Sequence, residues 1–179
     1  MQFLCWHKCC FAANCIPLLI QQRVDGSDFF NRSWAEFKAG FNDSRGNYWL
    51  GNELLSQLTS SGRYKLRFDL QETDGNRSWY WAEYSRFTVL NEASNYALHV
   101  AGYSSNTGSF DAFGYSNRMM FTTYDRDNDA PNTNCAVLEG GGFWHKDCSW
   151  CNVNTIHFSS YDGRRHIHLA TTRMWLMCQ

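Results

Sequence analysis

An acidic loop carries the clearest chemistry in the sequence. Asp125, Asp127 and Asp129 stand at alternate positions of the segment DRDND, so a looped backbone can turn their carboxylates toward one point. Oxygen ligands on a flexible loop suit calcium, which takes about six to eight of them and accepts backbone carbonyls. The segment is not an EF-hand, because Ala130 and Ala136 stand where that loop needs glycine and glutamate. From spacing alone, a calcium loop and a solvated acidic turn are equally supported.

The chain contains 8 cysteines, a number that favours an oxidising compartment. A bond between Cys135 and Cys148 would close a loop of about 14 residues and add about 3 kcal/mol of stability in the chain-entropy model. The remaining pairings stay open, and we expect Cys151 to pair with another cysteine, with Cys178 as one candidate, or to stay a thiol. The other cysteines all fall in the first fifteen residues: Cys5, Cys9, Cys10 and Cys15.

Other chemistries are weaker interpretations. Cys148 and Cys151 form a C-x-x-C, but no βαβ pattern surrounds them, so redox catalysis is disfavoured. Zinc binding has no H-E-x-x-H or paired C-x-x-C to support it, and surface or pocket-edge positions are the favoured interpretation for His145, His157, His166 and His168. The sequence shows no nucleophile elbow, phosphate loop or paired-carboxylate context, so we predict that the protein is not an enzyme.

Composition limits the remaining classes. The 179 residues carry 16 Lys and Arg against 17 Asp and Glu, which argues against a basic nucleic-acid-binding face. No apolar run is long enough to span a membrane. Three N-x-S sequons, at Asn31, Asn42 and Asn76, fit a secreted protein, although residues 1–15 show no secretory signal.

The elements that position these residues follow from local patterns. We expect short helices over about 33–41 and 52–58, the second burying Leu54, Leu55 and Leu58. Clean alternation predicts a strand at 64–70, and further strands are expected at 78–89 and 95–100. Trp79 and Trp81 could form a sugar-stacking platform, although core packing is the commoner explanation. Residues from about 103 to 165 resemble long loops, which need disulfides or a metal to become ordered.

A set of ordered motifs resembles the fibrinogen C-terminal (fibrinogen-related) domain. The motifs lie between about Ile20 and Met177: 20–27 (IQQRVDGS), 48–53 (YWLGNE), 125–129, 134–137 (NCAV), the pair Phe143-Trp144, Cys148 and 170–176. The resemblance implies an α+β fold with a central twisted antiparallel sheet, short flanking helices and a loop-rich calcium and ligand subdomain. It divides the chain into an irregular Cys-rich segment at 1–16 and a domain at 17–179. Within that domain the sheet subdomain takes about 17–120 and a last strand at 168–177, and the loops take about 121–167.

The resemblance also implies a calcium site and a disulfide. By position in the motif, Asp127 and Asp129 supply carboxylates, Pro131 and Thr133 supply carbonyls, and Asp125 is a flanking acid. Cys135 and Cys148 match the family's disulfide. In relatives the peptide before the second of these cysteines is often cis.

In ficolin-like and tachylectin-like members, this region holds a pocket for acetyl groups. Matching positions make the amides of Cys148 and Ser149 the hydrogen-bond donors and Phe158 and Tyr161 the walls. The chain departs from that pattern at three positions. Ser149 stands where relatives commonly carry His, Glu139 where they often carry an aromatic residue, and Arg164 where they usually carry Trp. The loop at 154–158 is also shortened.

The resemblance therefore predicts a secreted, calcium-dependent recognition module that binds acetylated or microbial glycans, as in innate-immune pattern recognition. The alternative is an extracellular matrix or signalling ligand of the angiopoietin or tenascin type that binds a cell-surface protein. Either module would form a homo-oligomer in the full-length protein, because weak single sites gain from avidity. The family's N-terminal subdomain is missing from the chain, which resembles a truncated domain.

Overall fold

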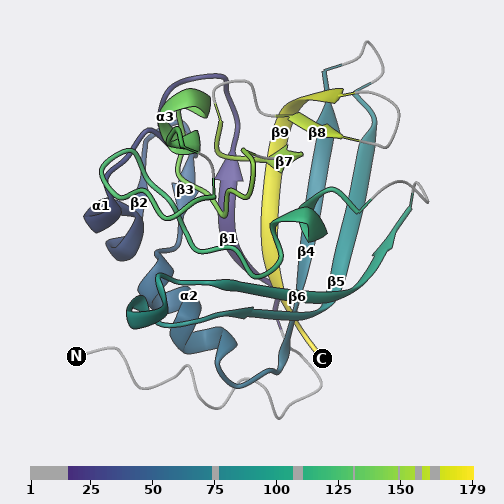
Figure 1. Ribbon diagram of the computed structural model, residues 1–179. Helices are drawn as coiled ribbons and strands as arrows, with labels where there is room; N and C mark the ends of the chain where they lie inside the picture. The colour runs from purple at the N-terminus through teal and green to yellow at the C-terminus, as the bar shows by residue number, and fades with distance from the viewer. Residues whose placement is uncertain are drawn as a thin grey trace.

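The computed structural model describes residues 16–73, 77–106, 111–130, 132–148, 150–155, 159–161 and 166–179, with the backbone alone at 159–161, 166 and 167. The predicted segment 1–16 therefore lies outside the described residues except for Ile16. A nine-stranded antiparallel sheet forms the centre, with its main strands in the order β2-β3-β1-β9-β4-β5-β6 (Figure 1). The strands are β1 Leu18–Arg23, β2 Phe41–Asn42, β3 Tyr48–Trp49, β4 Tyr64–Glu72, β5 Trp79–Val89, β6 Leu98–Ser105, β7 Cys151–Asn152, β8 Ser159–Tyr161 and β9 His166–Cys178.

Short helices complete the α+β fold that the sequence predicts. They are α1 Trp34–Ala39, α2 Asn52–Thr59, α3 Cys135–Glu139 and the 3₁₀ turns η2 Glu92–Ser94 and η3 Phe113–Ser116. The last strand, β9, pairs with β1 on one side and β4 on the other. The C-terminal strand thus occupies the middle of the sheet, and β8 joins the loop region to its first residues.

The alternation of β4 sets the two faces of the sheet. Leu66, Phe68 and Leu70 are buried in the core, while the residues between them face outward. Strand β5 does not alternate as regularly, because Tyr84, Phe87 and Val89 are buried while the adjacent Ser85 and Arg86 are both exposed. Trp79 lies on the outer face and is 44% exposed, so the expectation of core packing is wrong for this residue. The guanidinium of Arg173 lies 5.2 Å from its ring centroid.

Helix α1 is shorter than predicted, whereas α2 lies where it was predicted, to within one residue, and differs in which residues it buries. Helix α1 begins at a capping box made by Ser33 and Glu36 and ends at Ala39, because Gly40 has φ 90° and ψ 155°. Helix α2 buries Asn52, Leu55, Ser56 and Thr59. Leu54 is 43% exposed, so its predicted burial is wrong. Successive side chains of an α-helix point about 100° apart around the helix axis. Leu54 therefore lies next to the buried stripe rather than within it.

Candidate calcium and ligand site

The acidic loop brings two carboxylates together. The backbone N–H of Asp129 donates to Oδ1 of Asp127 at 3.2 Å, and Oδ2 of Asp129 accepts from the backbone N–H of Cys135 at 2.9 Å. The other oxygen of Asp129, Oδ1, is buried and has no hydrogen-bond donor among the described residues. A buried carboxylate oxygen of this kind is costly unless a cation or a donor compensates it.

The electrostatics of the loop fit a cation. Burial raises the pKa of Asp129, and the negative charge of Asp127 raises it further, although the N–H of Cys135 opposes both effects. A divalent ion would reverse this shift by favouring the charged form. The carboxylates of Asp127 and Asp129 therefore fit calcium, which prefers oxygen donors. Thr133 is exposed in the adjoining segment, while Pro131 lies outside the described residues.

Asp125 anchors the loop. Its Oδ1 accepts from the backbone N–H of Trp34, the first residue of α1, at 2.8 Å and from Oγ1 of Thr123 at 2.7 Å. The side chain of Asn128 donates to the carbonyl of Phe121 at 2.8 Å, and this hydrogen bond joins the acidic loop to the segment before its start. Asp125 is therefore used to fix the loop to α1, as the resemblance implies for a flanking acid.

The disulfide ties the next segment down. Cys135 and Cys148 are bonded, with 5.0 Å between their Cα atoms. Their pairing matches the one that the resemblance implies. The peptide between Asp147 and Cys148 is trans rather than cis, because the described residues contain no cis bond. Cys148 instead adopts the left-handed region, with φ 49°.

The predicted acetyl-binding residues are partly visible. The backbone N–H of Cys148 donates to Sγ of Cys135 at 2.9 Å, so it is engaged inside the loop. Ser149 and Phe158 lie outside the described residues, as does the side chain of Tyr161. Of these four groups, only the N–H of Cys148 therefore belongs to the described residues.

A polar cluster stands where the resemblance implies an aromatic wall. Glu139, at the end of α3, accepts from Nδ2 of Asn152 at 2.8 Å. His145 is fully buried, with Nε2 3.1 Å from the carbonyl oxygen of Gly141 and Nδ1 4.0 Å from Oε2 of Glu139. Burial lowers the pKa of His145, although the charge of Glu139 opposes the shift. Burial thus favours the neutral imidazole.

Buried polar residues of β1 hold the segment after the disulfide. Nε2 of Gln21 donates to the carbonyl of Val153 at 3.2 Å and to Oδ1 of Asn154 at 3.1 Å. Nη1 of Arg23 donates to the carbonyl of Asn154 at 3.3 Å, and burial lowers the pKa of Arg23 to about 10. Sequence reasoning used the QQR run only as a family motif and missed this role. The available signal was two long polar side chains, Gln21 and Arg23, on alternate positions of one strand.

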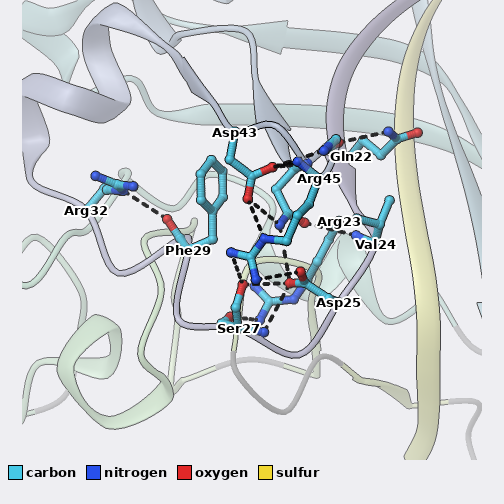
Figure 2. Close-up of polar contacts among 11 residues, drawn as sticks. Gln22, Arg23, Val24, Asp25, Ser27, Phe29, Arg32, Asp43 and Arg45 are labelled. Atoms are coloured by element: carbon cyan, nitrogen blue, oxygen red, sulfur yellow. Dashed lines mark hydrogen bonds and ion pairs between the residues drawn. The ribbon is translucent and has the colours of Figure 1, made fainter.

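Beyond β1, a second polar cluster fixes the adjoining turns. Figure 2 shows Arg45 between Asp25 and Asp43, with ion-pair distances of 3.1 and 3.2 Å. Arg23 reaches the carbonyl of Ser27 in the same view. Although burial opposes it, hydrogen bonds from Asn47 and from backbone N–H groups lower the pKa of Asp43 to about 2. These contacts hold the turn that follows β1 against the turn between β2 and β3.

The alternative metal and redox interpretations gain no support. Across the part of the chain that the structure describes, no three His, Cys, Asp or Glu side chains gather as a metal site. His145 is fully buried, so the expectation of a surface or pocket-edge position is wrong for this residue, whereas His168 is exposed. Cys151 is a buried thiol and Cys178 is disulfide-bonded, so the suggested bond between them is wrong.

The outer surface of α3 is apolar. Val137 and Leu138 are 60% and 63% exposed, and Tyr124 is 47% exposed. The amide of Asn134, which caps α3, also donates to the carbonyl of Tyr124 at 3.4 Å. These three exposed apolar residues therefore flank the acidic loop, and we refer to them as the α3 patch.

Comparison with known proteins gives consistent matches. The family described as "Fibrinogen beta and gamma chains, C-terminal globular domain" matches residues 9–175. Human ficolin-3 is 41% identical over 137 residues, which are 76% of this chain and 45% of ficolin-3. Mouse angiopoietin-related protein 7 is 38% identical over 149 residues, 83% of this chain and 43% of that protein. The chain thus spans about half the length of these curated relatives.

Solved structures agree with the sequence matches. The fibrinogen-like globe domain of human ANGPTL2 superposes with a TM-score of 0.79 at 32% identity, covering 90% of this chain and 80% of that one. A lamprey fibrin D-dimer in complex with the peptide Gly-His-Arg-Pro-amide gives 0.73 at 28% identity, covering 88% and 60%. Among the described residues, no helix is long and apolar enough to cross a membrane.

Proposed function

The chain belongs to the family of fibrinogen C-terminal globular domains, a family of non-enzymatic binding modules, and on that premise we propose that it is a secreted, calcium-dependent recognition module without catalytic activity. The observation that carries the proposal is the buried, donor-free Oδ1 of Asp129 beside the carboxylate of Asp127. Secreted relatives such as ficolin-3 and fibrinogen support the extracellular assignment.

Asp127 and Asp129 would hold the ion, and the carbonyls of Pro131 and Thr133 would complete the site. A bound calcium ion supplies positive charge that compensates the two carboxylates. The chain's own residues fix the geometry: Asp125 ties the loop to α1, and the N–H of Cys135 orients the carboxylate of Asp129. Binding and order of the loop are therefore coupled, because the ion binds only the folded arrangement.

The first ligand class that we propose is acetylated glycans, bound by Cys148, Ser149, Phe158 and Tyr161 beside the calcium loop. Binding by the N–H of Cys148 would require this group to leave Sγ of Cys135. The similarity to ficolin-3 supports this class. A glycan array probed with the purified chain in calcium and then in EDTA tests it. Calcium-dependent binding to N-acetylated sugars is the expected result, and binding that persists in EDTA or silence on every sugar would exclude it.

A protein partner is the second candidate, because the α3 patch presents apolar side chains to solvent. Exposed apolar surface of this kind is typical of protein-binding sites. The similarity to angiopoietin-related protein 7 and to a fibrin fragment solved with a peptide ligand supports this candidate. Leu138→Asp should abolish binding to a cell-surface protein while leaving binding to acetylated sugars unchanged. The reverse pattern would exclude the protein candidate.

A further inference from the structure

Two of the three sequon asparagines are exposed in the fold. Asn31 precedes α1 and Asn42 ends β2, and both lie on the surface. Within the described residues, neither carboxamide takes part in a hydrogen bond, so neither is needed to hold the fold. The serine of the second sequon, Ser44, is also exposed. Asn76 lies outside the described residues.

The structure brings these two sequons to one flank of the molecule. The guanidinium of Arg32, which follows Asn31, lies 5.6 Å from the ring centroid of Phe41, which precedes Asn42. Arg32 also lies 5.1 Å from the ring centroid of Phe29, and Figure 2 shows its Nε donating to the carbonyl of Phe29, at 3.0 Å. Arg32 and Phe41, each adjoining one of the two sequon asparagines, are therefore in contact.

We propose that Asn31 and Asn42 carry N-linked oligosaccharides, so that this flank of the domain is covered by carbohydrate. This inference rests on the secretion that forms part of the proposed function. The co-reactant is an oligosaccharide on a lipid pyrophosphate, supplied with its transferase in the secretory pathway. The carboxamide nitrogen forms a bond to C1 of the first sugar, the bond from C1 to the pyrophosphate oxygen breaks, the amide loses one proton and the lipid pyrophosphate leaves.

Transfer needs only the local sequence, and the folded structure must then tolerate the product. The middle residues of the two sequons are Arg32 and Asp43, neither of which is proline. Ser33 forms the capping box of α1 through its own hydroxyl and Glu36, and Asn31 takes no part in it. A glycan on Asn31 therefore leaves the start of α1 intact.

Asn42 stands at an edge of the sheet. Strand β2 is the first in the sheet order and pairs only with β3 among the described strands (Figure 1). Edge strands are open to pairing with other chains unless something covers them. A bulky, solubilising glycan on Asn42 would shield this edge. Partners would then have to approach the domain from another flank.

The test is expression of the full chain, behind an added secretion leader, in eukaryotic cells. Treatment with peptide N-glycosidase converts a glycosylated asparagine to aspartate, and peptide mass spectrometry reads the conversion. We expect aspartate at positions 31 and 42. Asn31→Gln and Asn42→Gln should each remove one of the two mass shifts. Ser44→Ala should remove the shift at Asn42, whereas the matched variant Ser44→Thr should retain it.

Three other outcomes would overturn the inference in different ways. A secreted chain with asparagine unchanged at either position overturns the assignment for that residue and leaves the recognition function intact. A chain retained inside the cell and unmodified overturns both this inference and the proposed secretion. A shift that persists in Asn42→Gln and in Ser44→Ala would place the carbohydrate elsewhere, and so also contradicts the assignment.

Discussion

Substitution of Asp129 by asparagine should have opposite effects with and without calcium. Without calcium, Asp129→Asn removes a partly buried negative charge that Asp127 repels, while the single amide oxygen of asparagine can take the place of Oδ2 and accept from the N–H of Cys135. The variant should therefore melt at or above the wild-type temperature. With calcium, the wild type gains binding energy that the variant lacks, so the order of the two melting temperatures should reverse.

The size of the calcium effect follows from linkage. Extracellular calcium modules bind with dissociation constants on the order of 10⁻⁴–10⁻³ M, so about 10 mM calcium stands at about ten to a hundred times Kd. Binding to the native state alone then adds about 1.4 to 2.7 kcal/mol. For a chain of this length the melting temperature should rise by about 3–10 °C.

Differential scanning fluorimetry in EDTA and in calcium measures both effects, with magnesium as the control ion. Asp25→Asn is the control, because Asp25 pairs with Arg45 and takes no part in the acidic loop. It should keep the full calcium shift. A wild type indifferent to calcium, or an Asp129→Asn variant with the wild-type shift, would refute the calcium assignment.

Three further predictions concern stability. Replacing Cys135 and Cys148 together by serine should lower the free energy of unfolding by about 3 kcal/mol in urea titrations, and no change would show that the loop orders without its bond. Gly40→Ala should cost at least about 1–3 kcal/mol, because Gly40 has φ 90° and a Cβ there would lie 2.5 Å from a backbone oxygen, whereas Gly26→Ala meets nothing within 4 Å and should be neutral. The ionised carboxylate of Asp43 stabilises the folded state above its unfolded pKa of 3.8, and this stability is lost as pH falls toward about 2. Asp43→Asn should therefore flatten the decline of the melting temperature between these two pH values. An unchanged pH profile would show that the hydrogen bonds to Asp43 add no net stability.

Local patterns predicted the parts of the fold that depend on local geometry. The alternation of Leu66, Phe68 and Leu70 identified β4 and its buried face, because side chains of a strand alternate whatever their partners are. Leu54 shows where this reasoning stops. Its neighbours make a plausible apolar stripe, but only the sheet against which α2 packs decides which stripe is buried.

The candidate site was predicted from ordered motifs, but the contacts that hold its loops in place were not predicted. The acidic spacing and the resemblance pointed to Asp127 and Asp129, which the structure places together. The contact between Gln21 and Asn154 spans 133 positions, and no local pattern encodes a contact of that range. The trans peptide before Cys148 also departs from the resemblance, because tertiary surroundings determine the local backbone there.

The loop region is ordered by several ties that act on different segments. Asp125 fixes the acidic loop to α1, the Cys135–Cys148 bond closes the following segment, and Gln21 holds the residue after it. None of these contacts uses the donor-free oxygen of Asp129. Removal of calcium should therefore loosen the acidic loop alone and leave the sheet and the disulfide loop folded.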